Sequence, residues 1–307
     1  MDNILFLLSF VMLFFGGELL VRSSVALALR MRISTLVVGM TVVSFVTSSP
    51  ELFVSIKSAL NGLTDITFGN VIGSNIANIT LVLGLTAIVF RINITKQTIK
   101  INFPVMFLAF ILFGSVLYLF NEINQITGII FVSLLILFSW ILIKMSSRFV
   151  DEFEEEIKTP LFQSVLYMIV GIVLLVYGSE FLVNGVQSIA ILFEWDDRIV
   201  SVSLVAIGTS LPELATSLVA AFRKESNLAI GNLIGSNIFN VLAVLGITSI
   251  IHPIEMMNEN LFVDYLWMMT SVVILGLFIY VFSKKQISRT EGLLLLIFYI
   301  VFMFFLF

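Results

Sequence analysis

The sequence predicts an all-α polytopic membrane protein with ten transmembrane helices, arranged as two inverted five-helix repeats. Of its 307 residues, 59% are hydrophobic and only 12% are charged, against about 25% charged residues in soluble domains. Apolar stretches long enough to cross a bilayer recur along the whole chain, and polar motifs of the first half return in the second. This composition excludes a water-soluble enzyme, and we expect neither enzymatic activity nor a bound cofactor.

The lengths of the apolar stretches predict the spans. A hydrocarbon core of about 30 Å requires about 20 helical residues. Polar breaks divide the chain into ten stretches of suitable length, at 3–29, 35–60, 68–90, 101–120, 125–145, 161–192, 198–222, 228–251, 261–283 and 290–307. The first stretch is too long for the apolar region of a signal peptide, and Asp2 stands where such a peptide is basic. We therefore expect it to be a spanning helix.

The basic residues predict the orientation, because short cytoplasmic loops collect Lys and Arg. Of the 16 basic residues, only Lys57 and Arg198 lie at span ends on one side, and all the others lie on the other side. We therefore expect a multi-pass protein of the inner cell membrane with both termini extracytoplasmic. The formal net charge of −4 gathers mostly at 151–156 and predicts no nucleic-acid partner.

An internal repeat divides the chain. An offset of 162 residues aligns three polar blocks: Gly16–Val21 with Gly178–Val183, Thr47–Leu52 with Thr209–Leu214, and Gly69–Asn78 with Gly231–Asn240. We place the first repeat at 1–147 (motif region about 39–86), an acidic cytoplasmic linker at 148–160, and the second repeat at 161–307 (motif region about 201–248). Because five spans per repeat is an odd number, the second copy enters the membrane from the opposite side. Inverted repeats are typical of transporters whose site lies near the midplane.

Two glutamates mark the expected site. Glu51 and Glu213 fall inside the second and seventh predicted spans, where an unpaired charge costs at least about 2.5 kcal/mol. Since no Lys or Arg lies at comparable depth, their partners are protons, hydrogen-bond donors or mobile cations; a protonated, hydrogen-bonded pair is the structural alternative. Helical spacing places further candidates on the same faces, namely Ser44 and Thr47 beside Glu51, and Ala206 and Thr209 beside Glu213. Pro50 and Pro212 free backbone carbonyls next to the carboxylates.

The third and eighth spans supply a matching polar surface. Its candidates are Ser74, Asn78, Ser236 and Asn240, joined by the hydroxyls of Ser48 and Ser210 beside the prolines. Hydrogen bonding between helices is their alternative role. All donors are hard oxygens, and with no cysteine and a single histidine they suit Ca²⁺ or Na⁺ rather than zinc or copper. Two carboxylates neutralise one divalent ion, and monovalent ions competing for the same oxygens would produce exchange.

The motifs resemble a known family. The pattern Gly-Thr-Ser-x-Pro-Glu, followed 18 residues later by Gly-Asn-x-Ile-Gly-Ser-Asn-x-x-Asn, is similar to the repeats of the cation/calcium exchanger superfamily, in its prokaryotic Na⁺/Ca²⁺ branch. The resemblance spans the chain and implies four ion sites between the second, third, seventh and eighth helices. It also implies that the first and sixth helices slide as a pair to alternate access.

The resemblance implies a ligand set for each ion. Ca²⁺ would use the carboxylates of Glu51 and Glu213 with the carbonyls of Thr47 and Thr209. The inner Na⁺ site would use the Ser44 carbonyl, Thr47, Glu51 and Ser74, and the outer one the Ala206 carbonyl, Thr209, Glu213 and Ser236. Asn78 and Asn240 would complete the fourth site. The expected partners are therefore Ca²⁺, Na⁺ or H⁺ and the lipid bilayer, with the monomer functional.

Some features leave alternatives open. Val46 stands where the second repeat has Gly208, which puts the symmetry of the two monovalent sites in doubt. An H⁺/Ca²⁺ antiporter is the second functional hypothesis, and a cation channel without coupled transport is the third. Glu18 and Glu180 are symmetric acidic residues in the first and sixth spans, where they either guard an access path or play a structural role.

Overall fold

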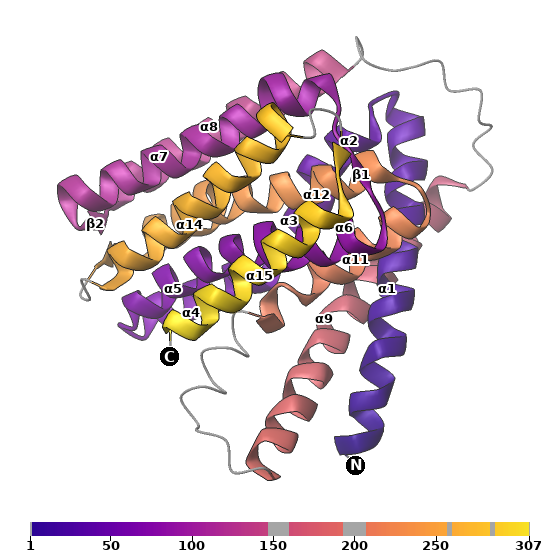
Figure 1. Ribbon diagram of the computed structural model, residues 1–307, viewed down its shortest axis with the longest axis horizontal. Helices are drawn as coiled ribbons and strands as arrows, with labels where there is room; N and C mark the ends of the chain where they lie inside the picture. Colours follow the sequence, from indigo (N-terminus) through magenta and orange to yellow (C-terminus); the bar gives the residue numbers. More distant parts are fainter. Residues whose placement is uncertain (1, 147–159, 193–206, 257–259, 283–285, 307) are drawn as a thin grey trace.

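The computed structural model describes residues 2–146, 160–192, 207–256, 260–282 and 286–306. Within these residues the chain is almost entirely helical, apart from four two-residue strands (Figure 1). Eight helices are long and apolar enough to cross a membrane, and a bent pair makes a ninth candidate. The protein is therefore a multi-span membrane protein, as its composition predicts.

The first half contains these elements in order: α1 (Asp2–Met31), α2 (Thr35–Val38), the π-helix η1 (Gly39–Val43), α3 (Ser44–Thr47), α4 (Ser49–Leu60), α5 (Thr64–Ile76), the π-helix η2 (Ala77–Val82), α6 (Leu83–Val89), β1 (Ile92–Asn93), the π-helix η3 (Thr98–Asn102), α7 (Phe103–Phe120), β2 (Glu122–Ile123) and α8 (Gln125–Ser146). Elements that follow one another without a gap form single spans, so that α5, η2 and α6 make one span from Thr64 to Val89. The predicted span at 125–145 coincides with α8 almost residue for residue.

The second half contains α9 (Leu161–Leu192), α11 (Leu211–Phe222), α12 (Ser226–Phe239), the π-helix η4 (Asn240–Leu245), α13 (Gly246–Ile251), β3 (Ile254–Glu255), α14 (Asn260–Leu277), the π-helix η5 (Phe278–Phe282), β4 (Gln286–Ile287) and α15 (Arg289–Leu306). The predicted seventh span, 198–222, is represented by α11, while residues 198–206 lie outside the described residues, as does most of the predicted linker.

The bounds of the elements repeat along the chain at the predicted offset of 162 residues. α4 and α11 correspond end to end, as do β1 and β3, and the two most interior spans begin at Thr64 and Ser226. The turn after α4 holds Gly62 at φ +73°, and its counterpart Lys224 has φ +64°. The two halves thus share the same local structure as well as the same motifs.

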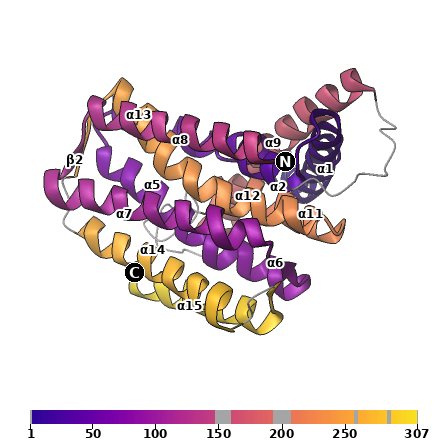
Figure 2. The same cartoon turned by 90° about the horizontal axis from the view of Figure 1, so that it is seen from above.

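The third and eighth predicted spans form the interior. The most apolar windows of Thr64–Val89 and Ser226–Ile251 are 78% and 83% buried, whereas those of the other long spans are at most 44% buried. Figure 2 shows α14 and α15 side by side at one edge, away from α1. Exposed Leu, Ile and Phe side chains cover the outer helices, as expected for surfaces that face lipid.

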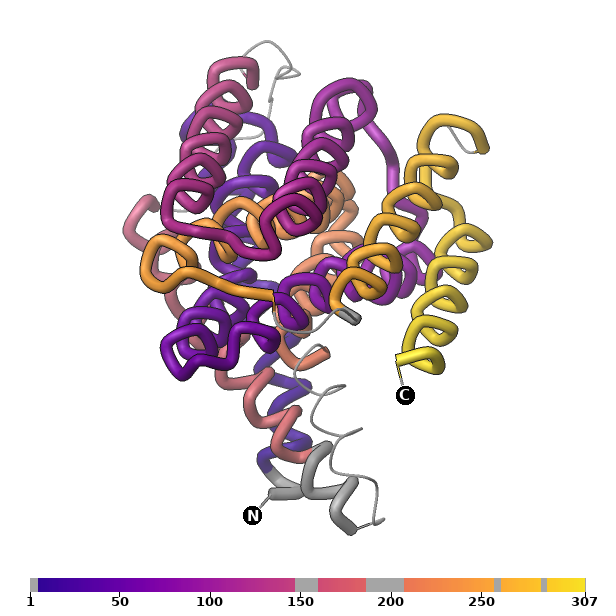
Figure 3. The backbone as a smooth tube through the Cα atoms, turned by 90° about the vertical axis from the view of Figure 1, so that its left-hand side faces the viewer, coloured from indigo at the N-terminus to yellow at the C-terminus, as the bar shows by residue number. Residues whose placement is uncertain are grey.

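α1 and α9 form an antiparallel pair on one flank of the molecule (Figures 1 and 3). Glycines bring them together: a Cβ at Gly16 would lie 3.0 Å from the Gly171 carbonyl oxygen, and one at Gly178 would lie 3.2 Å from the Leu13 backbone nitrogen. Since higher numbers in α1 meet lower numbers in α9, the two helices run in opposite directions. Small residues allow such close approach without large side chains between the backbones.

Two short antiparallel ribbons join the halves. β1 pairs with β4, with Ile92 opposite Ile287, and β2 pairs with β3, with Ile123 opposite Ile254. Each ribbon combines a connection of the first half with one of the second half. The connections that pair are those that the basic residues assign to the same side of the membrane.

Candidate ion site

The second span is broken next to the first candidate glutamate. α3 ends at Thr47 and α4 begins at Ser49, with a bend of 43° between the two parts of the span. Pro50 lies at the start of α4, where its missing N–H costs no helical hydrogen bond. The disturbance that Pro50 predicts thus falls between Thr47 and Glu51, so that Ser44 and Thr47 lie in α3 and Glu51 lies in α4.

This break places each glutamate at a helix N-terminus. Glu51 lies in the first turn of α4, and Glu213 lies in the first turn of α11, which likewise begins with a proline, Pro212. Backbone N–H groups are unpaired at a helix start, and the helix dipole is positive there. Both carboxylates thus occupy the position where a helix best stabilises a negative charge.

The two glutamates are fully buried, and three of their four carboxylate oxygens have no hydrogen-bond partner among the described residues. Glu51 and Glu213 each have 0% exposure. Within the described residues, both oxygens of Glu51 and Oε2 of Glu213 lack a hydrogen-bond partner. Ser48 Oγ donates to Glu213 Oε1 at 3.1 Å. Buried polar atoms are normally paired, so this group of acceptors is suited to a cation.

Two hydroxyl pairs bridge the halves in a repeat-related way. Thr47 Oγ1 lies 3.3 Å from Ser236 Oγ, and Thr209 Oγ1 lies 3.2 Å from Ser74 Oγ. In each pair, a threonine beside a broken helix of one half meets a serine from the interior span of the other half. The structure thus brings together hydroxyl groups that are far apart in the sequence and places them beside the carboxylates.

Ser44 and Ser210 occupy different environments. Ser44 Oγ donates to the Gly39 carbonyl at 2.7 Å, while the Ser44 carbonyl accepts the Ser48 N–H at 2.9 Å. Ser210 immediately precedes α11, and its buried hydroxyl has no partner within the described residues. Ala206 lies outside the described residues.

The two asparagines predicted for the fourth site begin or border π-helical segments. Asn78 lies in η2 and Asn240 opens η4. Both are fully buried, and in the described part of the chain neither amide oxygen nor nitrogen has a hydrogen-bond partner. π-Helical turns occur often at functional sites. These amides make no hydrogen bond to the glutamate cluster, yet they are available for a ligand.

Sequence reasoning missed two further asparagines. Asn70 Nδ2 donates to the Glu51 carbonyl at 3.1 Å and to Ser55 Oγ at 3.0 Å. Its counterpart Asn232 accepts from Thr47 Oγ1 at 3.1 Å and donates to Ser217 Oγ at 3.3 Å. Both asparagines tie the interior spans to the helices that carry the glutamates. Their role could have been inferred from the sequence, because each asparagine stands four residues before a predicted serine in a repeated block.

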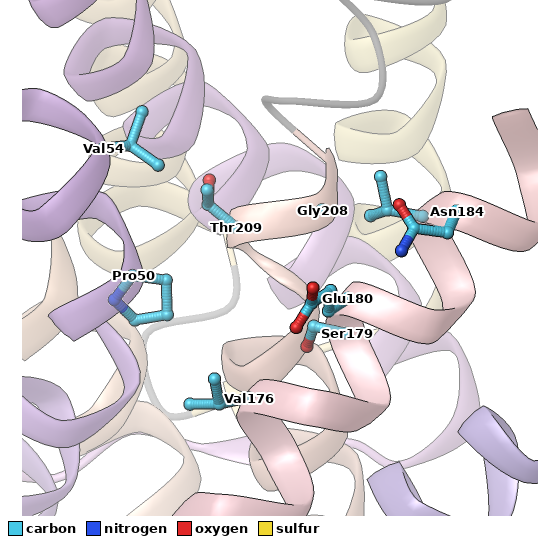
Figure 4. A pocket seen from close by; sticks show the side chains of 9 residues that line it. Pro50, Val54, Val176, Ser179, Glu180, Asn184, Gly208 and Thr209 are labelled. Atoms are coloured by element: carbon cyan, nitrogen blue, oxygen red, sulfur yellow. The ribbon is translucent and has the colours of Figure 1, made fainter. Parts of the chain in front are cut away.

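A cavity of about 280 Å³ leads toward the site from one side. Figure 4 shows Pro50 and Val54 of α4 on one wall, Glu180 of α9 on another, and Thr209 between them. Thr209 is hydrogen-bonded to Ser74 of the hydroxyl pairs. The cavity therefore lies between residues 176–184 of α9 and the hydroxyl pair of Thr209 and Ser74.

A multi-span membrane protein that buries two carboxylates among hydroxyl and amide groups can hold cations within an apolar barrier. The chain belongs to the sodium/calcium exchanger protein family, whose profile matches residues 3–144 and again 163–307, in the prokaryotic branch of the cation/calcium exchanger superfamily. It is therefore a member of a transporter family and not of an enzyme family.

Individual relatives match over nearly the whole chain. The putative antiporter CaxA of Alkalimonas amylolytica is 34% identical, over 99% of this chain and 98% of its own. The sodium/calcium exchanger MaX1 of Methanosarcina acetivorans is 27% identical, over 99% and 98%. A solved structure of the sodium-calcium exchanger NCX_Mj soaked with zero Na⁺ and Ca²⁺ superposes with a TM-score of 0.85 at 32% identity, covering 98% of this chain and 97% of that one.

Proposed function

We propose that the protein is a secondary active antiporter that exchanges Ca²⁺ for Na⁺ by alternating access. One observation carries the proposal: two fully buried glutamates have unpartnered oxygens and are surrounded by hydroxyls from both halves. The similarity to proteins named sodium/calcium exchangers supports the choice of ions. Na⁺ and Ca²⁺ are the transported substrates.

Under this proposal, Ca²⁺ is held by the carboxylates of Glu51 and Glu213 and by the carbonyls of Thr47 and Thr209. The Na⁺ ions occupy overlapping positions. The inner one uses the Ser44 carbonyl, Thr47, Glu51 and Ser74, and the outer one the Ala206 carbonyl, Thr209, Glu213 and Ser236. Ser48, Ser210, Asn78 and Asn240 supply the remaining oxygens. The unpaired side chains of Ser210, Asn78 and Asn240 support such roles.

Exchange follows from the electrostatics of this site. Two carboxylates neutralise one Ca²⁺ or two Na⁺, and the shared oxygens prevent both kinds of ion from binding fully together. A doubly charged empty site is unfavourable within the apolar barrier, although the N-termini of α4 and α11 lower that cost. The protein therefore changes its open side when loaded, and coupling needs no covalent chemistry.

We further propose ten spans in two inverted repeats, 1–147 and 161–307, with both termini outside the inner membrane and a functional monomer. The antiparallel course of the repeat-related helices α1 and α9 supports the inversion. The division of the connections between two sides of the membrane is supported by the strand ribbons, each of which pairs two connections of the same predicted side. In this arrangement α1 and α9 slide together to open one side and close the other.

Transport into proteoliposomes tests the function. Vesicles loaded with Na⁺ and diluted into Na⁺-free buffer should take up ⁴⁵Ca²⁺ without added K⁺. The matched control is Glu51→Gln protein, which should take up none. Uptake driven only by a pH gradient would instead indicate an H⁺/Ca²⁺ antiporter. Downhill Ca²⁺ flux that needs no counter-ion would indicate a channel.

A further inference from the structure

The two halves differ where the first helix of each meets the other half. α1 packs tightly on α11, so that a Cβ at Gly17 would lie 3.1 Å from the Ala215 carbonyl oxygen. Between its counterpart α9 and α4 lies instead the cavity of about 280 Å³, and Val54 of α4 forms part of the cavity wall (Figure 4). The access route between α1 and α11 is therefore closed, and the repeat-related route between α9 and α4 is open.

An ion-pair cluster spans the closed contact. Glu18 of α1 binds Arg223, which directly follows α11, and Arg223 Nε donates to Glu18 Oε2 at 2.6 Å. A second bond joins Arg223 Nη2 to Glu18 Oε1, which also accepts from Arg22 Nε one turn further along α1. The Glu18 side chain is only 12% exposed. Removing a partner from such a carboxylate leaves a poorly hydrated charge in the contact.

The open route keeps the carboxylate but lacks both arginines. At the repeat offset of 162, Glu18 corresponds to Glu180, Arg22 to Asn184, and Arg223 to Asn61. Glu180 is exposed in the cavity wall and forms no ion pair with any described residue. The backbones match: Asn61 has φ −89°, ψ 5°, and Arg223 has φ −81°, ψ 5°. The difference thus lies in the side chains and persists whichever route is open.

We propose that Glu18, Arg22 and Arg223 form an ionic gate that holds one access route closed, and that the described residues form no equivalent gate on the other route. The inference rests on the proposed alternating access, and in the proposed orientation Arg223 lies on the cytoplasmic side. Closing the outer route, between α9 and α4, brings Glu180 against the amides of Asn61 and Asn184. Closing the inner route, between α1 and α11, instead forms charge-assisted hydrogen bonds between Glu18 and the two arginines. The sequence therefore favours the conformation with the inner route closed.

Single cysteines can report the two routes, because the natural chain has no cysteine. Val54→Cys lies in the open cavity, and Thr216→Cys stands at the repeat-related position on α11, which is fully buried. In protein reconstituted into nanodiscs, where both faces are accessible, a small thiol reagent should label Val54→Cys rapidly and Thr216→Cys slowly. Adding Arg223→Asn or Glu18→Gln should raise Thr216→Cys labelling about tenfold and slow Val54→Cys labelling.

Two further variants separate the gate from a general loss of packing. Lys224→Asn removes a neighbouring positive charge at a left-handed position that Asn tolerates, and it should change neither labelling rate. Asn61→Arg should supply the missing partner for Glu180 and thereby shift both labelling rates in the same directions as Arg223→Asn, without breaking any ion pair. It also keeps the test available if Arg223→Asn does not fold.

The outcomes are distinct. Unchanged Thr216→Cys labelling in Arg223→Asn, Glu18→Gln and Asn61→Arg proteins overturns the gate, and so does an equal effect of Lys224→Asn. Labelling reports accessibility without requiring transport. A protein that exchanges ions but shows no shift therefore refutes only the gate, whereas a protein that shows the shift but exchanges no ions refutes only the antiport.

Discussion

Ser48 Oγ donates a 3.1 Å hydrogen bond to Glu213 Oε1, so the break in the second span of one half orients the carboxylate of the other half. Ser48 is available for this bond because the helix ends beside it, at Thr47, and begins again at Ser49. The two halves consequently share one site, and a substitution in the first half is expected to alter an ion ligand of the second.

Ser48→Ala is expected to lower the Ca²⁺ affinity about tenfold to a hundredfold. A hydrogen bond to a charged group contributes about 1.5–3 kcal/mol, and each 1.4 kcal/mol corresponds to about tenfold in Kd. Calorimetric titration of purified protein with Ca²⁺ provides the measurement. Ser49→Ala is the matched control, because the Ser49 hydroxyl bonds the Phe45 carbonyl at an exposed position. Equal affinities of the two variants would contradict the proposed positioning.

Glu51→Gln and Glu213→Gln should each abolish Ca²⁺ exchange while leaving a folded protein. Each variant preserves the side-chain volume but removes one of the two charges that neutralise Ca²⁺, and the remaining charge matches only a monovalent ion. Proteoliposome uptake at saturating Ca²⁺ measures the loss, and size-exclusion chromatography checks folding. Glu255→Gln, in the β3 ribbon opposite Glu122, removes an acidic charge far from the site in sequence and should retain exchange. Transport by either site variant would refute the central site.

The paired asparagines predict a coupling that is similar in the two halves. Asn232 donates a hydrogen bond to Ser217, and Asn70 donates one to Ser55. The effects of the Asn→Ala and Ser→Ala substitutions on the free energy of unfolding should therefore not be additive within either pair. Coupling between polar side chains in membrane proteins averages about 0.6 kcal/mol. Double-mutant cycles on denaturant unfolding in mixed micelles would measure it, with the crossed pair Asn70 and Ser217 as the additive control. Additivity within both bonded pairs would show that these contacts contribute nothing specific.

Much of the fold could be predicted because each span is bounded by polar residues. The observed α8 and α9 follow the predicted 125–145 and 161–192 almost residue for residue. The break at Ser48 could not be placed, since Pro50 indicates a disturbed helix but the bend depends on packing around it. The docking of the halves was equally inaccessible: the Thr47 hydroxyl bonds Ser236 and Asn232 of the second half and not Ser74. Local spacing along one helix contains no information about such contacts.

The tightest approach to backbone atoms beside the site lies at Gly231 of α12. A Cβ there would lie 2.5 Å from the Leu36 carbonyl oxygen, and one at Gly39 would lie 2.7 Å from the Leu228 carbonyl oxygen. The two glycines therefore let α12 lie directly on α2 and η1. This contact determines how near Asn232 and Ser236 come to Thr47.

Gly231→Ala is accordingly expected to lower both stability and Ca²⁺ affinity. Inserting a methyl group into a packed contact costs about 1–3 kcal/mol, and the obstacle is backbone, which cannot rotate away as a flexible side chain can. The displacement moves α12 away from Thr47 and lengthens its bonds to Asn232 and Ser236. A thermal-shift assay and a Ca²⁺ titration measure the two effects. Asn227→Ala, exposed in the first turn of the same helix, should change stability by less than about 0.5 kcal/mol. A Gly231→Ala protein that loses stability but binds Ca²⁺ normally would show that this contact supports the fold without positioning the site.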